Sequence, residues 1–337
     1  MNERALKVLE QYDLEVNSMR RGRGSYILDT PQGIRILSDC TFSERKGLFQ
    51  NRVMQQVRQG GYEKVDLILA NKEGNLISRD WEENRYVVRE WYGGRECDTE
   101  NEQEILAAVG NLARLHLLMR LPEEKTEGNE MDTESFRQSF TAPSPLQTIR
   151  AQNAELKKIR SFVRKKQSKG LFERQFLQDF SFYYEQAEEA QRRLELNWNE
   201  QENLTECTDG RVCHGDYDHH HVWMIGNEMA TTDFSCCRFD YQVIDLYRFM
   251  RKILEKREWN AQLGMRMLER YTQIRTLPEK ERQLLYIRML YPEKFRKLAN
   301  YYYGGNKAWI SRRYSDKLSM LNRQREKREA FVQLLRP

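Results

Sequence analysis

Residues 212–224 hold four of the chain's five histidines together with Asp216 and Asp218. Imidazoles and carboxylates move protons near neutral pH and ligate metal ions, so this stretch could do acid-base catalysis or bind metal. It could also be a polar surface turn. A third reading is a zinc site built from Cys213, His214, His219, His221, Cys236 and Cys237. Adjacent cysteines lack the Cys-x-x-Cys spacing of structural zinc sites, however, and successive histidines in extended chain point to opposite faces.

A hairpin pattern follows directly. Residues 222–225 and 229–232 are short strand-like runs, and the Gly226-Asn227 pair between them is typical of a two-residue turn. Pairing about this turn puts Thr232 opposite His221 and Asp233 opposite His220. We therefore expect Asp216, His221 and Asp233 to converge on one site.

The composition bounds the class of protein. A chain of 337 residues is long enough for two lobes, and 39% hydrophobic with 32% charged residues indicates a soluble globular protein. The first ten residues show no signal-peptide pattern, and no window resembles a transmembrane helix. Six cysteines without framework spacing fit reduced thiols in a cytoplasm.

The net charge of +5 is uneven, because basic residues are concentrated in residues 281–337. Such a tract could dock on an acidic protein, an anionic surface or nucleic acid. The favoured interpretation is a solvated helix face, since Arg323, Arg325, Lys327 and Arg328 are interleaved with Glu326 and Glu329. Without a nucleic-acid-binding motif beside it, we expect no nucleic-acid partner.

The N-terminal part predicts a small sheet. A short helix is expected over residues 2–12, strands over 26–28, 34–37, 65–69 and 85–91, and a longer helix over 43–59. Gly22 and Gly24 lie in the first hairpin, where backbone amides could approach a phosphate. The Gly93-Gly94 pair marks the predicted boundary, with residues 1–91 as the first lobe, 92–95 as a hinge and 96–337 as the second lobe.

The remainder predicts helices. A capping box of Thr99 and Glu102 opens a helix that runs through Met119 and carries His116 as a packed residue. Residues 121–148 are expected to be a loop. Further helices are expected over 149–166, 171–197 and 243–254, and then to the end of the chain with breaks near Pro278, Pro292 and Gly304-Gly305.

The order of motifs resembles a known group. His214-Gly215-Asp216, His221 five residues after Asp216, Asp233 after the hairpin and Asp245 at a helix start resemble the core of the aminoglycoside phosphotransferase and choline kinase group. Residues 89–97, 291–295, 301–303 and 307–311 look like the CotS family of bacterial spore-coat proteins. The resemblance implies an α+β, protein-kinase-like two-lobed fold, with a small antiparallel-sheet N-terminal lobe and a large, mainly helical C-terminal lobe.

The resemblance also implies roles. Asp216 would orient and deprotonate an acceptor hydroxyl, Asp233 would hold a metal ion on the nucleotide phosphates, and His214 and Asp245 would brace the loop. Glu90, Trp91 and Tyr92 would form the hinge beside adenine, with Gly22 and Gly24 near the phosphates. The implied cofactor is ATP with Mg²⁺ or Mn²⁺.

Two positions depart from that pattern. His221 replaces an asparagine metal ligand, and magnesium prefers oxygen to imidazole. Ser38 stands where a strand lysine would grip the phosphates, and Arg35 cannot replace it because three residues along a strand reverse the face. Arg21 or Arg23 could reach the phosphates instead. Each departure would lose transition-state stabilisation, so together they predict a weakened kinase.

Two functions follow. The first is a spore-coat protein with a kinase-like fold, weak or inactive as a kinase, acting in coat structure or assembly. The alternative is an ATP-dependent phosphotransferase acting on a small hydroxylated molecule or a coat-protein hydroxyl. Expected partners are other spore-coat proteins and nucleotide. We expect synthesis in the mother-cell cytoplasm and deposition on the spore coat.

Overall fold

The computed structural model describes residues 4–22, 24–121, 133–198, 209–304 and 312–337. Packing divides the chain into two compact units: unit 1 comprises residues 1–131, 210–249 and 270–275, and unit 2 comprises 132–209, 250–269 and 276–337. The predicted hinge, residues 92–95, lies inside unit 1, so the units do not follow the predicted lobe boundary. Within the described ranges, no helix has the length and apolar character needed to cross a bilayer.

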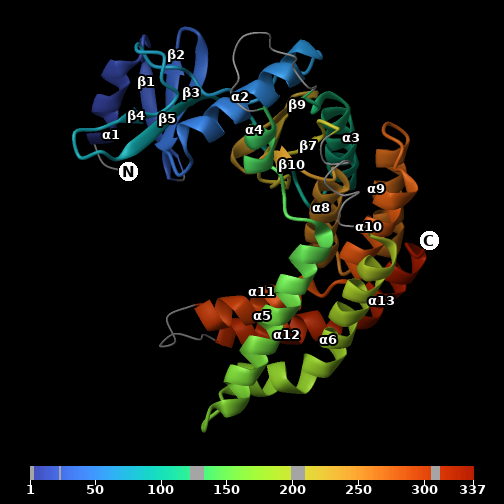
Figure 1. Ribbon diagram of the computed structural model, residues 1–337. Helices are drawn as coiled ribbons and strands as arrows, with labels where there is room; N and C mark the ends of the chain where they lie inside the picture. The colour runs from blue at the N-terminus through green and yellow to red at the C-terminus, as the bar shows by residue number, and fades with distance from the viewer. Residues whose placement is uncertain (1–3, 23, 122–132, 199–208, 305–311) are drawn as a thin grey trace. The chain divides into compact units, whose positions relative to one another are not determined.

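Unit 1 begins with α1 (Arg4–Lys7), a 3-10 turn (Val8–Gln11) and a five-stranded antiparallel sheet in the order β1-β2-β3-β5-β4. The strands are β1 (Ser18–Gly22), β2 (Ser25–Thr30), β3 (Gly33–Asp39), β4 (Ser78–Arg79) and β5 (Arg85–Glu90). Figure 1 shows them side by side near the N-terminus. The predicted N-terminal antiparallel sheet is confirmed.

The two faces of this sheet have different covers because strand side chains alternate. One face packs Tyr26, Leu28, Leu37, Tyr86 and Val88 against Val8 and Tyr12. The other face carries α2 (Glu44–Gln59), whose Ser43 N-cap accepts a hydrogen bond from Lys46 N at 3.2 Å. Helix α2 was predicted to within one residue.

The rest of unit 1 forms a helix and two small sheets. These elements are α3 (Glu102–Leu118), β6 (Arg95–Glu96), β7 (Val212–Cys213), β8 (Val222–Ile225), β9 (Glu228–Thr231), the 3-10 turn Phe234–Cys236, β10 (Arg238–Phe239) and the start of α8 (Val243–Lys256). The predicted hairpin is confirmed, since Val222 pairs with Thr231 and Ile225 with Glu228 about Gly226-Asn227.

Three local predictions need correction. Residues 65–69 form isolated bridges, Val65 to Thr231 and Ile68 to Arg89, instead of a strand. Helix α3 is capped by Asn101, whose side chain accepts from Gln103 N and Glu104 N, so the predicted box of Thr99 and Glu102 is wrong. The predicted loop over 121–148 contains α4 (Thr133–Ser139), and its residues 122–132 lie outside the described part.

Unit 2 is helical. Its elements are α4, α5 (Pro145–Lys165), α6 (Leu171–Asn197), the end of α8, most of α9 (Ala261–Thr272), α10 (Glu279–Leu290), α11 (Glu293–Gly304), α12 (Arg312–Arg323) and α13 (Arg325–Leu334). Helix α6 matches its predicted bounds. Helix α5 starts four residues earlier than predicted, because Ser144 caps it and Pro145 occupies its first turn.

Aromatic rings fill the core of unit 2. Phe295 stacks on Phe176 at 5.1 Å and on Tyr183 at 4.5 Å between ring centroids, and Phe172 stacks on Tyr302 at 5.0 Å. These rings belong to α6 and α11, and such pairs add to the stability that burial alone provides. The C-terminal block that carried the resemblance therefore contributes core residues here, while its residues 307–311 lie outside the described part.

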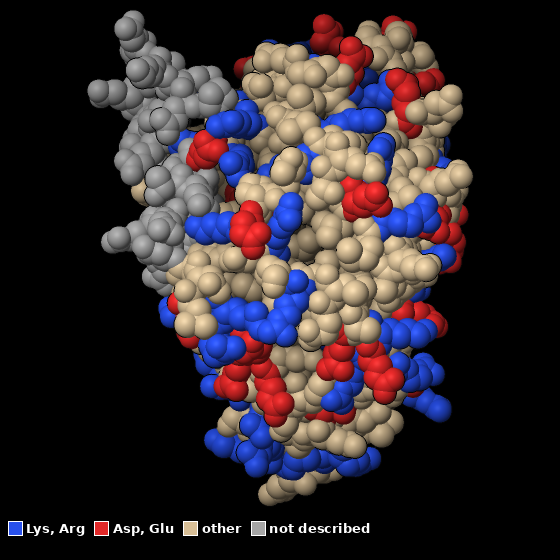
Figure 2. All heavy atoms as spheres, turned by 90° about the vertical axis from the view of Figure 1, so that its right-hand side faces the viewer, with Lys and Arg blue, Asp and Glu red and all other residues tan. Residues whose placement is uncertain are grey.

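The predicted solvated face of the basic tract is only partly correct. Over the face drawn in Figure 2, lysines and arginines are intermixed with acidic side chains. Arg328, however, is buried: its guanidinium donates to the carbonyls of Met289 and Leu290, both at 2.8 Å, and of Tyr291 at 3.2 Å. These carbonyls end α10, so Arg328 serves the fold of unit 2.

Candidate active site

The His214-Gly215-Asp216 loop is held in place by hydrogen bonds to α8. Asp245 in the first turn of α8 accepts from His214 N at 2.6 Å and from Gly215 N at 2.9 Å. Gly215 has φ +83°, and a Cβ there would lie 2.1 Å from the Cys236 carbonyl oxygen, so only glycine fits. The expectation that Asp245 holds the loop is confirmed.

His116 anchors Asp245 in turn. Its Nδ1 lies 2.6 Å from the Tyr271 hydroxyl, and its Nε2 lies 3.3 Å from Asp245 Oδ2. Burial alone would raise the pKa of Asp245, but the hydrogen bond and charge of His116 hold it below its usual value. His116 is thus the packed helix residue that the sequence predicted.

His214 is fully buried and braces the loop through both ring nitrogens. Nε2 lies 3.0 Å from the Thr232 carbonyl, which can only accept, so Nε2 carries the proton. Nδ1 then accepts from Asp216 N at 3.3 Å. Burial lowers the pKa of His214, so the ring stays neutral and serves the loop's geometry.

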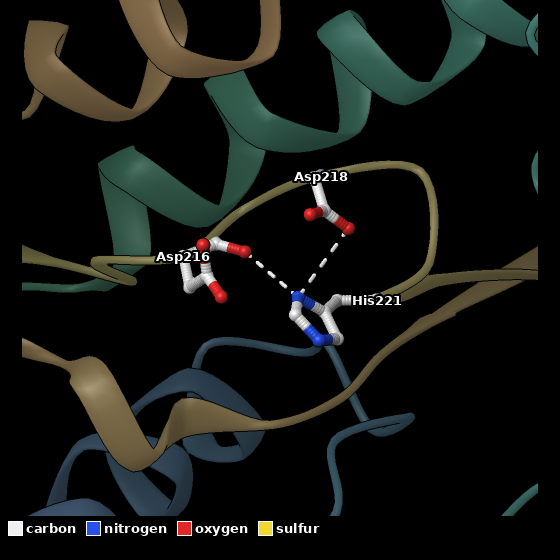
Figure 3. A group of neighbouring side chains, drawn as sticks. All are labelled: Asp216, Asp218 and His221. Carbon is white, nitrogen blue, oxygen red and sulfur yellow. Dashed lines mark hydrogen bonds and ion pairs between the residues drawn. The ribbon is translucent and has the colours of Figure 1, made fainter. Parts of the chain in front are cut away.

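Asp216, His221 and Asp233 lie together, as the hairpin predicted. The His221 main chain pairs with Thr232 N at 3.0 Å, and its ring reaches Asp216 O on one side and Asp233 on the other. Figure 3 shows one nitrogen of the His221 ring facing both Asp216 and Asp218, which lie on the same loop. His220 does not face Asp233; its ring contacts Glu96 at 2.6 Å.

The tautomer of His221 decides what the site can bind. Nδ1 lies 2.7 Å from the Asp216 carbonyl oxygen, so Nδ1 donates and the lone pair of the neutral ring is on Nε2. Nε2 lies 3.5 Å from Asp233 Oδ2. Two ligand atoms each about 2.1 Å from one ion lie roughly 3 to 3.5 Å apart, so this pair fits a divalent cation.

Another group has metal-ligand spacing. Among the described residues, the ligand atoms of Asp216, Asp218 and His221 lie within 4.8 Å of one another, and the group contains no cysteine. Asp218 Oδ1 already accepts from His220 N at 2.8 Å and faces the protonated Nδ1 of His221 at 3.5 Å. Asp218 therefore braces the loop, and the lone pair of His221 points toward Asp233.

Asp233 is held in a constrained conformation. Its φ is +63°, which is uncommon for a residue with a side chain, and its N–H donates to Asp66 Oδ2 at 2.9 Å. Burial alone would raise its pKa, but the hydrogen bond from Ser235 N and the charge of Arg89 hold the pKa of Asp233 below its usual value. The side chain is 46% exposed, so an ionised oxygen is open to a ligand.

Asp216 has a partner that the sequence did not indicate. Arg248, three residues after Asp245 on α8, forms an ion pair through its Nη1 with Asp216 Oδ1. Both side chains are about one-third exposed, so the pair lies at the edge of the site. An acceptor hydroxyl that uses Asp216 as its base would meet this guanidinium beside it.

The predicted phosphate side differs in its cations. Ser38 lies on the face of β3 toward α2. The Arg35 guanidinium donates hydrogen bonds to Ile34 O at 2.9 Å and to Gln32 O at 3.0 Å in the adjoining turn. Gly22 and Gly24 lie at the β1–β2 turn, where Gly24 has φ +71°. Arg21 lies 6.0 Å from the Tyr26 ring, and Arg23 lies outside the described residues.

The residues predicted to lie beside adenine, Glu90, Trp91 and Tyr92, are the last residue of β5 and the two that follow it. The Trp91 N–H donates to Ile34 O at 3.0 Å, and its ring meets Trp223 edge-on at 5.2 Å. Glu90 pairs with Arg58, and the Tyr92 hydroxyl donates to Val65 O at 2.8 Å. These contacts fix the segment, while its adenine-binding role stays a prediction.

Solved structures share the fold. An aminoglycoside phosphotransferase from Alicyclobacillus acidocaldarius superposes with a TM-score of 0.81 at 16% identity, covering 98% of this chain and 94% of that one. The spectinomycin phosphotransferase APH(9)-Ia with ADP and spectinomycin gives 0.62 at 11% identity over 99% and 94%. The amicoumacin kinase hAmiN with AMP-PNP and Ca²⁺ gives 0.57 at 15% identity over 96% and 92%.

These likenesses confirm the predicted architecture, the aminoglycoside phosphotransferase form of the kinase fold, with an N-terminal antiparallel sheet and a mainly helical C-terminal part. At such low identity they concern the fold alone. A family model described as "Spore coat putative kinase YutH" matches residues 5–335, and the chain belongs to that family.

Proposed function

We propose that the protein is a spore-coat component that binds ATP with a divalent cation at Asp233 and His221 and transfers phosphate slowly, if at all. The observation that carries the proposal is the contact of His221 Nδ1 with the Asp216 carbonyl at 2.7 Å, which leaves Nε2, 3.5 Å from Asp233 Oδ2, as the ring atom that can bind a metal ion. A bound cation would neutralise charge on the phosphates, which is its part in phosphoryl transfer.

The metal preference follows from the ligands. One imidazole and one carboxylate suit Mn²⁺ better than Mg²⁺, because magnesium favours an all-oxygen shell. Related folds have been solved with ADP, and with AMP-PNP and Ca²⁺, which supports nucleotide binding with metal in this chain. We place ATP against Gly22, Gly24 and the segment of Glu90, Trp91 and Tyr92, as the resemblance implies.

Slow transfer follows from two features. Ser38 supplies no cation on the phosphate side, and Arg248 pairs with the carboxylate that would act as base. A base must accept the acceptor's proton as the nucleophile attacks, and the Arg248 guanidinium occupies one of the carboxylate oxygens that the acceptor hydroxyl would approach.

The alternative, an active phosphotransferase, is favoured by one specific observation. His214 bonds the backbone of Asp216 and the carbonyl of Thr232 next to Asp233, and this arrangement supports the catalytic roles that the resemblance implies. The acceptor would be a small hydroxylated molecule or a coat-protein hydroxyl. If Arg248 is what restrains Asp216, Arg248→Gln should raise ATP turnover several-fold, and adding Asp216→Asn should remove that gain.

The cellular setting is also a proposal. The family match gives the spore-coat context, and the narrower likeness to the CotS family supports synthesis in the mother-cell cytoplasm and deposition on the coat. Other coat proteins would be its partners there. Deposition of a variant with charge reversal at the exposed Lys327 tests whether the basic tract docks on them, without disturbing the buried Arg328.

The binding proposal is tested by thermal melts with millimolar ATP. A ligand at one hundred times its dissociation constant adds about 2.7 kcal/mol to the free energy of unfolding, which raises Tm by several degrees. We expect a clear shift with Mn²⁺, a smaller one with Mg²⁺, and neither in Asp233→Ala. No shift with either ion in the unchanged protein would refute the proposal.

A further inference from the structure

The sheet face toward α2 lacks a cation at Ser38, but the next strand, β5, carries arginines on that face. In the register of β3 and β5, Ser38 pairs with Val87 and Ile36 with Arg89. Because side chains alternate along a strand, Ser38 and Arg89 share the face that α2 covers. One charged residue in a strand pattern usually points to solvent, so the strand pattern alone gives no sign that Arg89 is buried.

Arg89 is buried and tied to α2. Its side chain is 8% exposed, and Nη2 donates to Gln50 Oε1 on α2 at 3.0 Å. Nη1 lies 3.5 Å from both the carbonyl oxygen and Oδ2 of Asp66, and the guanidinium lies 5.4 Å from the Phe42 ring centroid. Arg89 thus contacts α2 through the Gln50 amide, and it contacts the candidate site through the Asp66 carboxylate.

Asp66 carries this contact to the metal-ligand candidate. The same Oδ2 that faces Arg89 accepts the N–H of Asp233 at 2.9 Å, which holds the left-handed backbone there. Asp66 is 1% exposed, and its Oδ1 has no hydrogen-bond partner among the described residues. Burial raises the pKa of Asp66 to about 7, and the charge of Arg89 opposes that rise.

In protein kinases, a strand lysine paired with a glutamate of the helix beside the sheet and a metal-binding aspartate must both be in place for phosphoryl transfer. We propose that Arg89, acting through Asp66, does this work in place of a lysine at Ser38: it is a positioning residue that links α2 to Asp233 and sets the geometry of the metal ligand. This inference rests on the proposed metal site at Asp233 and His221.

A buried ion pair could also serve stability alone, so the test needs a readout that stability does not move. In the full-length folded protein, Mn²⁺ affinity is measured by electron paramagnetic resonance without nucleotide. Partners behind a metal ligand typically change metal affinity about 10- to 100-fold. Arg89→Met should therefore weaken Mn²⁺ binding roughly tenfold or more.

Arg85→Met is the matched control. Arg85 lies on the same strand and face, and its guanidinium donates to Phe42 O, but it has no contact with Asp66 among the contacts of the described residues. It should leave Mn²⁺ affinity within twofold of the unchanged protein. Because Arg89 acts through Asp66, combining Arg89→Met with Asp66→Asn should cost little more than Asp66→Asn alone.

A second measurement keeps the inference testable if the unchanged protein binds no Mn²⁺, which would count against the proposed function only. Amide exchange in the metal-free protein reports the Asp233 N–H directly. Arg89→Met should speed exchange over residues 230–237, and Arg85→Met should not. If Arg89→Met folds with unchanged exchange there, or with unchanged Mn²⁺ affinity in a binding-competent protein, the inference is wrong.

If Arg89→Met fails to fold, Arg89→Lys keeps the charge and tests the same link. A lysine ammonium lacks the planar fork that reaches Gln50 and Asp66 together. We expect intermediate exchange over residues 230–237 and an intermediate Mn²⁺ affinity. Values equal to those of the unchanged protein would contradict a role for both contacts.

Discussion

Arg89 in unit 1 and Arg328 in unit 2 are both buried, and they make different contacts. Arg328 in unit 2 donates to three main-chain carbonyls at the end of α10 and to Gln186 Oε1 at 2.7 Å, all neutral acceptors. Arg89 in unit 1 faces a carboxylate whose other contact is the backbone of a candidate metal ligand. A buried cation that donates to the last carbonyls of a helix stabilises the fold, whereas one that faces an acid beside a candidate metal ligand can tune chemistry.

The largest expected effect concerns Arg328. Arg328→Met removes the donors to the carbonyls of Met289, Leu290 and Tyr291, and each buried acceptor left unpaired costs about 1 to 3 kcal/mol. We expect the free energy of unfolding to fall by about 3 kcal/mol or more in urea melts. Mn²⁺ affinity of the remaining folded protein should not change. A loss of Mn²⁺ binding would erase the contrast with Arg89.

The next effect is the pH dependence that Asp66 imposes. Burial raises its pKa to about 7, above the ordinary value of about 3.9, so the folded state binds this proton more tightly than the unfolded chain does. Its contribution to the free energy of unfolding is therefore present at low pH and lost as pH rises through about 7. Between about pH 5 and 7 the loss is on the order of 2 kcal/mol.

Asp66→Asn removes that titration. The asparagine Oδ1 can still accept from Asp233 N, so the fold should persist and its stability should depend less on pH over the same range. Denaturant melts of both proteins at about pH 5 and 7 check this. Equal pH slopes would show that Asp66 does not titrate there.

The smallest expected effect is at Lys327, next to Arg328 on α13. Its ammonium lies 2.6 Å from Glu258, but the two side chains are 59% and 70% exposed. Solvent screens such pairs, so Lys327→Met should change the free energy of unfolding by less than about 1 kcal/mol. A cost comparable to that of Arg328→Met would mean that the whole tract, and not one buried member, supports the fold.

Local signals in the sequence predicted much of the fold. Gly226-Asn227 specifies its turn by backbone conformation, and α6 has an unbroken helical pattern between clear ends. Helix caps were harder, because Thr99 and Asn101 are both suitable caps and only the folded chain selects Asn101. Residues 65–69 read as a strand, yet Asp66 within them serves the site.

The sequence predicted the contacts of the candidate site that form within one stretch of chain, and it missed those that come from distant elements. The hairpin brings His221 beside Asp233, and this follows from a turn within one stretch. Arg89, Asp66 and Arg248 reach the site from other elements, and each reads as an ordinary charged residue in its own segment. These three charged residues are buried or paired only by tertiary packing. The periodicity of the sequence cannot reveal such packing.

The claim that His221 and Asp233 form an imidazole–carboxylate metal site is tested most directly by comparing stabilisation with Mn²⁺ and with Mg²⁺ before and after substitution of His221. We predict that ATP stabilises the unchanged protein more with Mn²⁺ than with Mg²⁺, and that His221→Asn reverses or abolishes this preference by restoring an oxygen ligand. Equal stabilisation by the two ions in the unchanged protein, or the same preference in His221→Asn, would contradict the assignment.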